Sequence, residues 1–311
     1  GVIVQAQDPH LANFISLAAL RQFYGHHAYQ AQWHDPQRLA GLIHELESLT
    51  HDGLNPASYD VDGLRVLLTL LQGADAHTTW QMCDELWVTT VYLQALADLH
   101  HGRLRAAVVE PWWRFDEGIS QPQAGPAAAL VAAAAADLND LPGVFQRARP
   151  AMARYHALRA SHTRLSSVLL HGTSWPQLPS GPSLRPGERD PRVRILRQLL
   201  HLHAALQNAD VHLPVESLSS SAFNDDFYDE ALVAEVTRFQ EAHKLETDGI
   251  VGRATAAVLN VTPEQRLSQI RADLERTRWL AREIASVTAP RFVLVDIPSA
   301  SIHYFRNGEE V

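Results

Sequence analysis

The amino-acid sequence predicts a mainly α protein that ends in a short β segment. Through most of the 311 residues, apolar side chains recur at the three- and four-residue spacing of an amphipathic helix. Aspartate–proline pairs precede three of these stretches, and such a pair is a common start signal for a helix. After about residue 290 the pattern changes to the β-branched and aromatic composition of strands.

Composition and charge limit the class of protein. Asp and Glu outnumber Lys and Arg by 35 to 26, which leaves a formal net charge of −9 at pH 7. That balance argues against a basic face for nucleic acid or anionic lipid. No apolar stretch reaches the roughly 18 residues of a membrane span, and the length predicts about two or three domains.

Residues 1–172 are expected to form a helical domain. Helices are predicted after Asp8-Pro9 and Asp35-Pro36, and Asp60 is predicted to cap another one. Asp52-Gly53 is expected to end the second helix. The apolar positions predicted for the second and third helices are Leu39, Leu42, Ile43, Leu46, Leu64, Leu67, Leu68 and Leu71.

The only cysteine, Cys83, falls in a longer predicted helix that stops near Gly102. At helical spacing it shares an apolar face with Trp80 and Trp87, so we expect an inert thiol in the core. A single cysteine also excludes an internal disulfide framework. Any thiol chemistry within the chain would depend on this residue.

A second helical region follows a change in composition. Residues 173–189 are rich in proline and glycine and are predicted to be a linker or an extended crossing segment. Residues 190–261 are predicted to form a bundle of three short helices. Asp229 would cap the second helix, and Asp248-Gly249 would form a turn before the third.

The last part of the chain contains the only clear β signals. A connecting helix is expected within 262–290, followed by strands at 291–297 and 302–305 and a hairpin turn at Asn307-Gly308. An isolated hairpin is poorly stable in water. Residues 291–311 are therefore expected to open a larger β-rich domain that is truncated here.

One segment resembles a known family. The residues Phe239, Gln240, Asp248, Gly249, Gly252 and Thr255 resemble the signature of the peptidoglycan-binding three-helix domain. We expect Gly249 to supply a positive φ and Gly252 to permit close helix approach, so the motif residues are mostly architectural. Contacts to peptidoglycan would then come from neighbouring polar side chains and backbone in the loops.

Two further segments resemble the larger Gram-negative L,D-transpeptidases. Trp33, the run 52–56 and Tyr59 are similar to their helical scaffold domain, and residues 293–308 to the opening hairpin of their catalytic domain. The resemblance implies cysteine acyl transfer that cross-links peptidoglycan in the periplasm, without a cofactor. The hallmark Ser/Thr-His-Gly-Cys segment does not occur in the 311 residues. This chain is expected to contain no catalytic residue, to be inactive by itself, and to have lost a signal peptide or anchor.

Other readings of the sequence stay open. Trp112 and Trp113 are candidates for stacking on sugars, although such aromatics more often anchor a loop. Adjacent histidines such as His100-His101 point in different directions on a helix, so no metal site is predicted. The alternatives to a transpeptidase are a stand-alone wall-binding protein without activity and the binding part of an amidase or carboxypeptidase. The sequence leaves the oligomeric state open.

Overall fold

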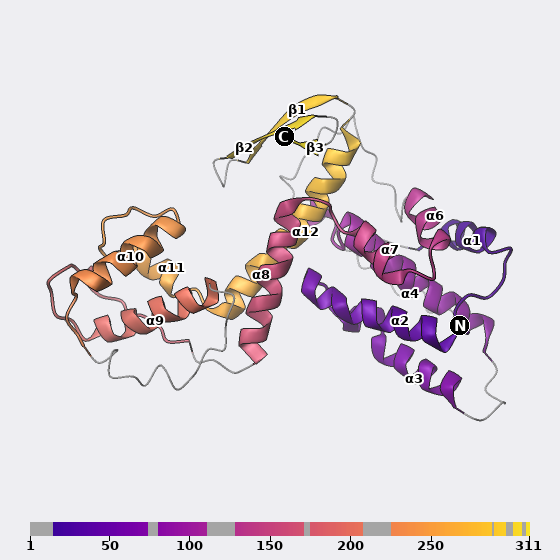
Figure 1. The fold of residues 1–311 in the computed structure, drawn as a ribbon, viewed down its shortest axis with the longest axis horizontal. Coiled ribbons are helices and arrows are strands. Elements are labelled where there is room, and N and C mark those ends of the chain that lie inside the picture. The colour runs from indigo at the N-terminus through magenta and orange to yellow at the C-terminus, as the bar shows by residue number, and fades with distance from the viewer. Residues whose placement is uncertain are drawn as a thin grey trace. The chain divides into compact units, whose positions relative to one another are not determined.

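The computed structural model of the chain confirms the mainly α prediction. It describes residues 15–73, 80–110, 128–170, 175–207, 225–287, 289–296, 301–306 and 309–311. The chain divides into two compact units (Figure 1). The helical unit comprises Gly1–Arg159 and Arg271–Val311, and the three-helix unit comprises Ala160–Ile270.

The helical unit is built around its longest complete helix, α4 (Met82–His101). Helices α1, α6 and α7 pack on α4, and α2 packs between α7 and α3. The bounds of the other elements in chain order are α1 Leu17–His26, α2 Pro36–Ser48, η1 Leu49–Asp52, η2 Pro56–Tyr59, α3 Val61–Gln72, α5 Ala106–Val109, α6 Ala128–Ala136 and α7 Leu141–Ala148. Helix α8 (Ala153–Leu170) begins in this unit.

Local capping explains why these helices begin where they do. The Asp35 carboxylate accepts a hydrogen bond from the Gln37 amide at 2.9 Å, and Asp60 accepts one from Gly63 at 3.3 Å, so both predicted caps are confirmed. Helix α2 itself ends at Ser48, and the 3₁₀ turn η1 continues to Asp52. The helix start predicted at Asp8-Pro9 lies outside the described residues, and the described helix α1 begins at Leu17, after Ser16 as its cap.

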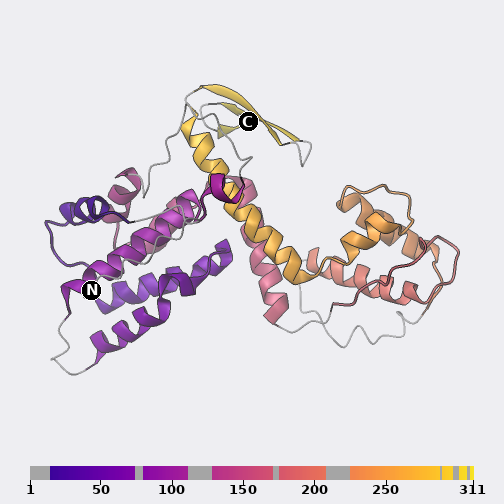
Figure 2. The same ribbon diagram turned by 180° about the vertical axis from the view of Figure 1, so that it is seen from behind.

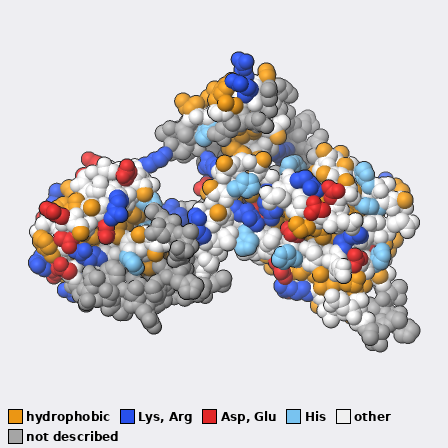
Figure 3. Space-filling model, viewed as in Figure 1, with side chains coloured by type: hydrophobic (Ala, Val, Ile, Leu, Met, Phe, Trp, Pro, Cys, Tyr) orange, Lys and Arg blue, Asp and Glu red, His pale blue; other side chains and the backbone are white. Residues whose placement is uncertain are grey.

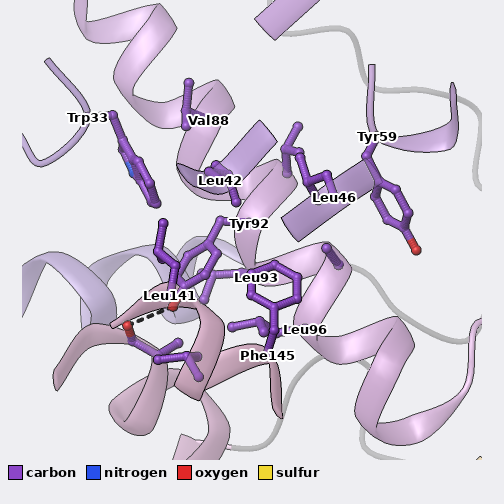
Figure 4. Close-up of a cluster of buried hydrophobic side chains, with 14 of the residues drawn as sticks. Trp33, Leu42, Leu46, Tyr59, Val88, Tyr92, Leu93, Leu96, Leu141 and Phe145 are labelled. Atoms are coloured by element: carbon purple, nitrogen blue, oxygen red, sulfur yellow. Dashed lines mark hydrogen bonds between the residues drawn. The ribbon is translucent and has the colours of Figure 1, made fainter. Parts of the chain in front are cut away.

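The predicted apolar positions of α2 form part of the core. Leu39, Leu42 and Leu46 are fully buried, together with Tyr92 of α4 and Phe145 of α7. Figure 4 shows Leu42, Leu46, Tyr92 and Phe145 within this cluster of buried side chains between the helices. The Tyr92 hydroxyl donates to the backbone oxygen of Ala134 at 3.0 Å, so the one polar atom of this ring is satisfied within the core.

The prediction that Cys83 is a core thiol is wrong, because Cys83 is exposed. Helix α4 instead buries Glu85, which is only 1% exposed. The carboxylate of Glu85 accepts the backbone amides of Gln32 and Trp33 at 2.6 and 3.1 Å and the Trp80 indole N–H at 3.0 Å. These donors compensate the cost of burying the charge. The buried face of the helix is therefore rotated away from Cys83.

The three-helix unit contains α9 (Arg192–Gln207), α10 (Glu230–Ala242) and α11 (Arg253–Leu259), and α12 (Pro263–Ser286) begins in it. Asp229 caps α10 as predicted, accepting from the Leu232 amide at 2.8 Å. The described part of the proline-rich segment is free of helix, as expected. It is not merely a tether, since Leu178 and Leu184 are buried in the core of this unit and Leu184 forms an antiparallel bridge with Val251.

The chain ends in a small antiparallel sheet with the order β1-β2-β3. Its strands are β1 Arg291–Asp296, β2 Ser301–Arg306 and β3 Glu309–Glu310, which confirms the predicted first hairpin. The turn predicted at Asn307-Gly308 lies outside the described residues, and β2 and β3 pair across it. On one face Phe292 stacks on Phe305 with ring centres 4.7 Å apart. Among the described helices, none has both the length and the apolarity for crossing a bilayer.

Candidate functional site

The motif residues of the three-helix unit meet at the end of α10, where Gln240 is 1% exposed. Its side-chain amide nitrogen donates to Asp248 Oδ1 at 2.9 Å and to the Ile250 backbone oxygen at 3.0 Å. Its amide oxygen accepts the Gly249 backbone N–H at 3.0 Å. A single glutamine side chain therefore fixes the turn that leads into α11.

The same turn is held from two other elements. Thr255 of α11 is buried, with its hydroxyl oxygen 3.3 Å from the Gln240 amide nitrogen. Tyr228, just before α10, donates its hydroxyl to the Gly249 backbone oxygen at 2.7 Å, and burial raises the pKa of this phenol. Both backbone polar groups of Gly249 are thus satisfied inside the fold. The part played by Tyr228 was not predicted, because no local pattern marks it.

The two motif glycines differ in what they require. Gly249 has φ +68°, as predicted, and a Cβ atom placed there would lie 2.9 Å from Val233 Cγ1. Gly252 has φ −85° and caps α11, and a Cβ there would meet only Ser183 Oγ at 3.8 Å. The expectation that Gly252 permits a close helix approach is wrong, because there is room for a side chain.

Asp248 is the motif residue that reaches the surface. It is exposed, while its Oδ1 accepts hydrogen bonds from the Ile250 amide at 2.9 Å and from Gln240. These hydrogen bonds, the Ile250 amide first, hold the pKa of Asp248 below its ordinary value. The turn therefore presents a fixed negative charge near neutral pH, within the exposed stretch 246–248.

Phe239 lies in a cluster of aromatic and histidine rings. Its ring centre is 4.4 Å from that of His243 and 5.0 Å from that of His203, which in turn contacts Trp175 at 5.0 Å. His203 Nε2 lies 3.1 Å from the Leu259 backbone oxygen. Burial lowers the pKa of His203 to about 4, so the ring is neutral at pH 7. This cluster was not predicted from the sequence.

The motif residues therefore stabilise the fold of the three-helix unit, and contacts to a ligand are left to residues on the surface of the unit. Phe239, Gln240 and Thr255 are buried, and only Asp248 is exposed. On the face of this unit shown in Figure 3, acidic, basic and hydrophobic side chains are interspersed. This face carries both charges and suits a polar ligand of mixed charge better than a polyanion.

The structure supports neither the predicted sugar-stacking tryptophans nor a metal site in the residues that it describes. Trp112 and Trp113 lie outside the described residues. Within the described ranges, no group of three or more His, Cys, Asp or Glu side chains is arranged to hold a metal ion.

Comparison with known families agrees with this geometry. Residues 215–259 match the family described as "Putative peptidoglycan binding domain". Residues 18–161 match the family described as "Scaffold domain". No curated protein matches the chain. The chain thus carries a scaffold domain and a peptidoglycan-binding domain, which supports cell-wall binding and indicates a cell-wall-associated, extracytoplasmic location.

Proposed function

We propose that this chain is the wall-binding and scaffolding part of a periplasmic L,D-transpeptidase. The observation that carries the proposal is the closed Gln240 network inside a unit that matches the peptidoglycan-binding family. The order of scaffold, binding domain and strand-rich tail is the order expected from the resemblance. The proposed domains are 1–172, 190–261 and 291–311, with the segments 173–189 and 262–290 between them.

The proposed contact surface is the loop between α10 and α11. Lys244, Glu246, Thr247 and Asp248 are exposed there, and the Gln240 network beneath holds the backbone in one conformation. Peptidoglycan stems present carboxylates and amines, and its glycan presents hydroxyls, so both charges and hydrogen-bonding groups have counterparts. A preformed loop loses little entropy on binding.

Binding is tested by co-sedimentation of the full chain with purified sacculi, against a tube without sacculi that detects aggregation. Val236 of α10 and Leu96 of α4 are both fully buried, in different units. The variant Val236→Asp disrupts the three-helix unit and is expected to abolish sedimentation. Leu96→Asp disrupts the helical unit and is expected to leave sedimentation with sacculi largely unchanged. Sedimentation that survives Val236→Asp and disappears in Leu96→Asp would assign binding to the helical unit instead.

The transpeptidase assignment is tested by the intact mass of the protein isolated from its own cells, compared with the 34.5 kDa of this chain. A mass larger by a whole domain is expected, and the peptide sequence of that added domain should contain a Ser/Thr-His-Gly-Cys segment. A mass of 34.5 kDa would refute the transpeptidase parent and leave a stand-alone wall-binding protein. A larger mass with a zinc-ligand pattern would favour an amidase or carboxypeptidase.

A further inference from the structure

The second half of α12 is polar in sequence, yet one face of it is buried in the structure. Within Arg271–Ser286, which belongs to the helical unit, Leu274 is fully buried and Arg278 is 1% exposed. Thr277 and Trp279 are 2% and 5% exposed. A helix that buries a guanidinium must meet matching polar groups on its neighbours, because an unpaired buried charge is strongly unfavourable.

Two of the groups that Arg278 meets come from the scaffold segments, and the third, Glu275, lies on α12 itself. One terminal nitrogen of Arg278 donates to the Tyr155 hydroxyl at 3.1 Å and to the backbone oxygen of Asp52. The other donates to Glu275 at 2.9 Å. The guanidinium carbon also lies 5.5 Å from the centre of the Tyr155 ring. Arg278 therefore contacts the end of η1 and the start of α8 at once.

Asp52, which Arg278 contacts through its backbone, is itself held rigidly. Its carboxylate is fully buried and pairs with Arg149 and Arg159, each at 3.0 Å, and it accepts the Tyr155 hydroxyl at 3.0 Å. The acceptor that α12 uses is thus fixed by residues about 100 positions away in the sequence. A fixed acceptor favours one position of α12 along its axis and one rotation about that axis.

A second contact lies just beyond the end of α4. Glu275 Oε1 accepts the Leu104 backbone N–H at 2.6 Å, and the Trp279 indole N–H donates to the Leu104 backbone oxygen at 3.0 Å. Two side chains of α12 therefore satisfy both polar groups of one scaffold residue. The views from both sides show α12 passing the end of α4 (Figure 1, Figure 2).

Two glycines make room for this contact. Gly53 has φ +73°, and a Cβ there would lie 3.2 Å from both Arg271 Cγ and Leu274 Cδ1. Gly102 has φ +87°, and a Cβ there would lie 2.7 Å from the Trp279 ring. The two helix ends that α12 crosses are thus free of side chains where it approaches.

We infer that residues 271–286 are a structural helix of the scaffold domain, although the family match ends at residue 161. The wall-binding unit is then an insertion between two segments of one domain. The helix that completes the domain leads directly into β1, so the scaffold determines where the strands begin. This inference is independent of the proposed peptidoglycan binding.

Native-state hydrogen exchange of the full chain, read by mass spectrometry, tests which unit protects α12. Leu96→Ala weakens the scaffold core and Val236→Ala weakens the three-helix unit, because the side chains of Leu96 and Val236 are fully buried. Leu96→Ala is expected to accelerate exchange of residues 274–282 together with α2 and α4, by roughly 30-fold or more. Val236→Ala is expected to accelerate α10 and leave 274–282 unchanged. The reverse pattern would overturn the inference.

A matched arginine pair tests the contact itself. Arg278→Met is expected to accelerate exchange of residues 274–282 by roughly 100-fold, because it removes the guanidinium that donates to Glu275 Oε2 and to the Asp52 carbonyl. Arg276, with a side chain 45% exposed, is the control, and Arg276→Met is expected to stay within about 3-fold. α10 should be unaffected in both. Equal effects of the two substitutions, or an effect of Arg278→Met on α10, would contradict a specific scaffold contact.

Discussion

Replacing each motif glycine by alanine separates what the turn requires from what the motif merely contains. At Gly249 the alanine must adopt φ +68°, which disfavours an L residue by about 1–2 kcal/mol. Its methyl group would lie 2.9 Å from Val233 Cγ1, and displacing a β-branched side chain costs about another 1–2 kcal/mol. The stiffer unfolded chain offsets about 0.5–1 kcal/mol. Gly249→Ala is therefore expected to destabilise the three-helix unit by about 1–3.5 kcal/mol.

Gly252→Ala provides the matched control. Its φ of −85° suits alanine, and the nearest atom to the new methyl is 3.8 Å away. The stabilisation from the lower entropy of the unfolded chain and the loss from a poorer cap on α11 nearly cancel, so the change in unfolding free energy is expected to stay within about 0.5 kcal/mol.

Urea unfolding of the full chain, followed by hydrogen exchange of peptides from α9 to α11, measures both variants in the relevant unit. Binding to sacculi at 25 °C should persist in Gly249→Ala as long as the unit remains folded, and should be lost at a lower temperature than in the wild type. Equal destabilisation by the two substitutions would refute the assignment of the positive φ to Gly249 alone.

Two further outcomes are expected. The His203 pKa falls from 6.5 in the unfolded chain to about 4 in the fold, so the unfolded state binds the extra proton first. The contribution of neutral His203 to the unfolding free energy of the three-helix unit should be fully present above pH 6.5. It should be lost as the pH falls towards 4, by roughly 2 kcal/mol after allowing for partial solvent access. A urea midpoint that is equal at pH 7 and pH 5, or that changes in the same way in His203→Leu, would contradict this. Cys83 is exposed and should react with a thiol reagent in native buffer within minutes. Reaction only after denaturation would show that the thiol is buried.

Local chemistry explains why much of the fold could be predicted. The caps Asp35, Asp60 and Asp229 act on amides two or three residues away, so neighbouring sequence is sufficient to define those helix starts. The positive φ at Gly249 is likewise a property of one short turn. The match of residues 215–259 to the peptidoglycan-binding family agrees with the motif seen in that segment.

The limits of prediction follow from polar burial. Helical periodicity assigns apolar residues to the inside and charged residues to the outside, and this rule led to the wrong prediction that Cys83 lies in the core. Glu85 is buried because donors more than 50 residues away satisfy its carboxylate. No window of sequence contains those donors together with the acceptor.

The sequence by itself determined the helix starts at Asp35, Asp60 and Asp229, the glycine turn, and the order of the scaffold, the wall-binding motif and the strands. The tertiary structure alone decided that residues 271–286 of α12 pack with the scaffold, since the hydrogen bond from Arg278 to Asp52 joins residues 226 positions apart. A guanidinium is stable in a protein interior only where acceptors are already in place. Whether they are in place depends on the folded chain as a whole, and so does the buried position of this polar helix.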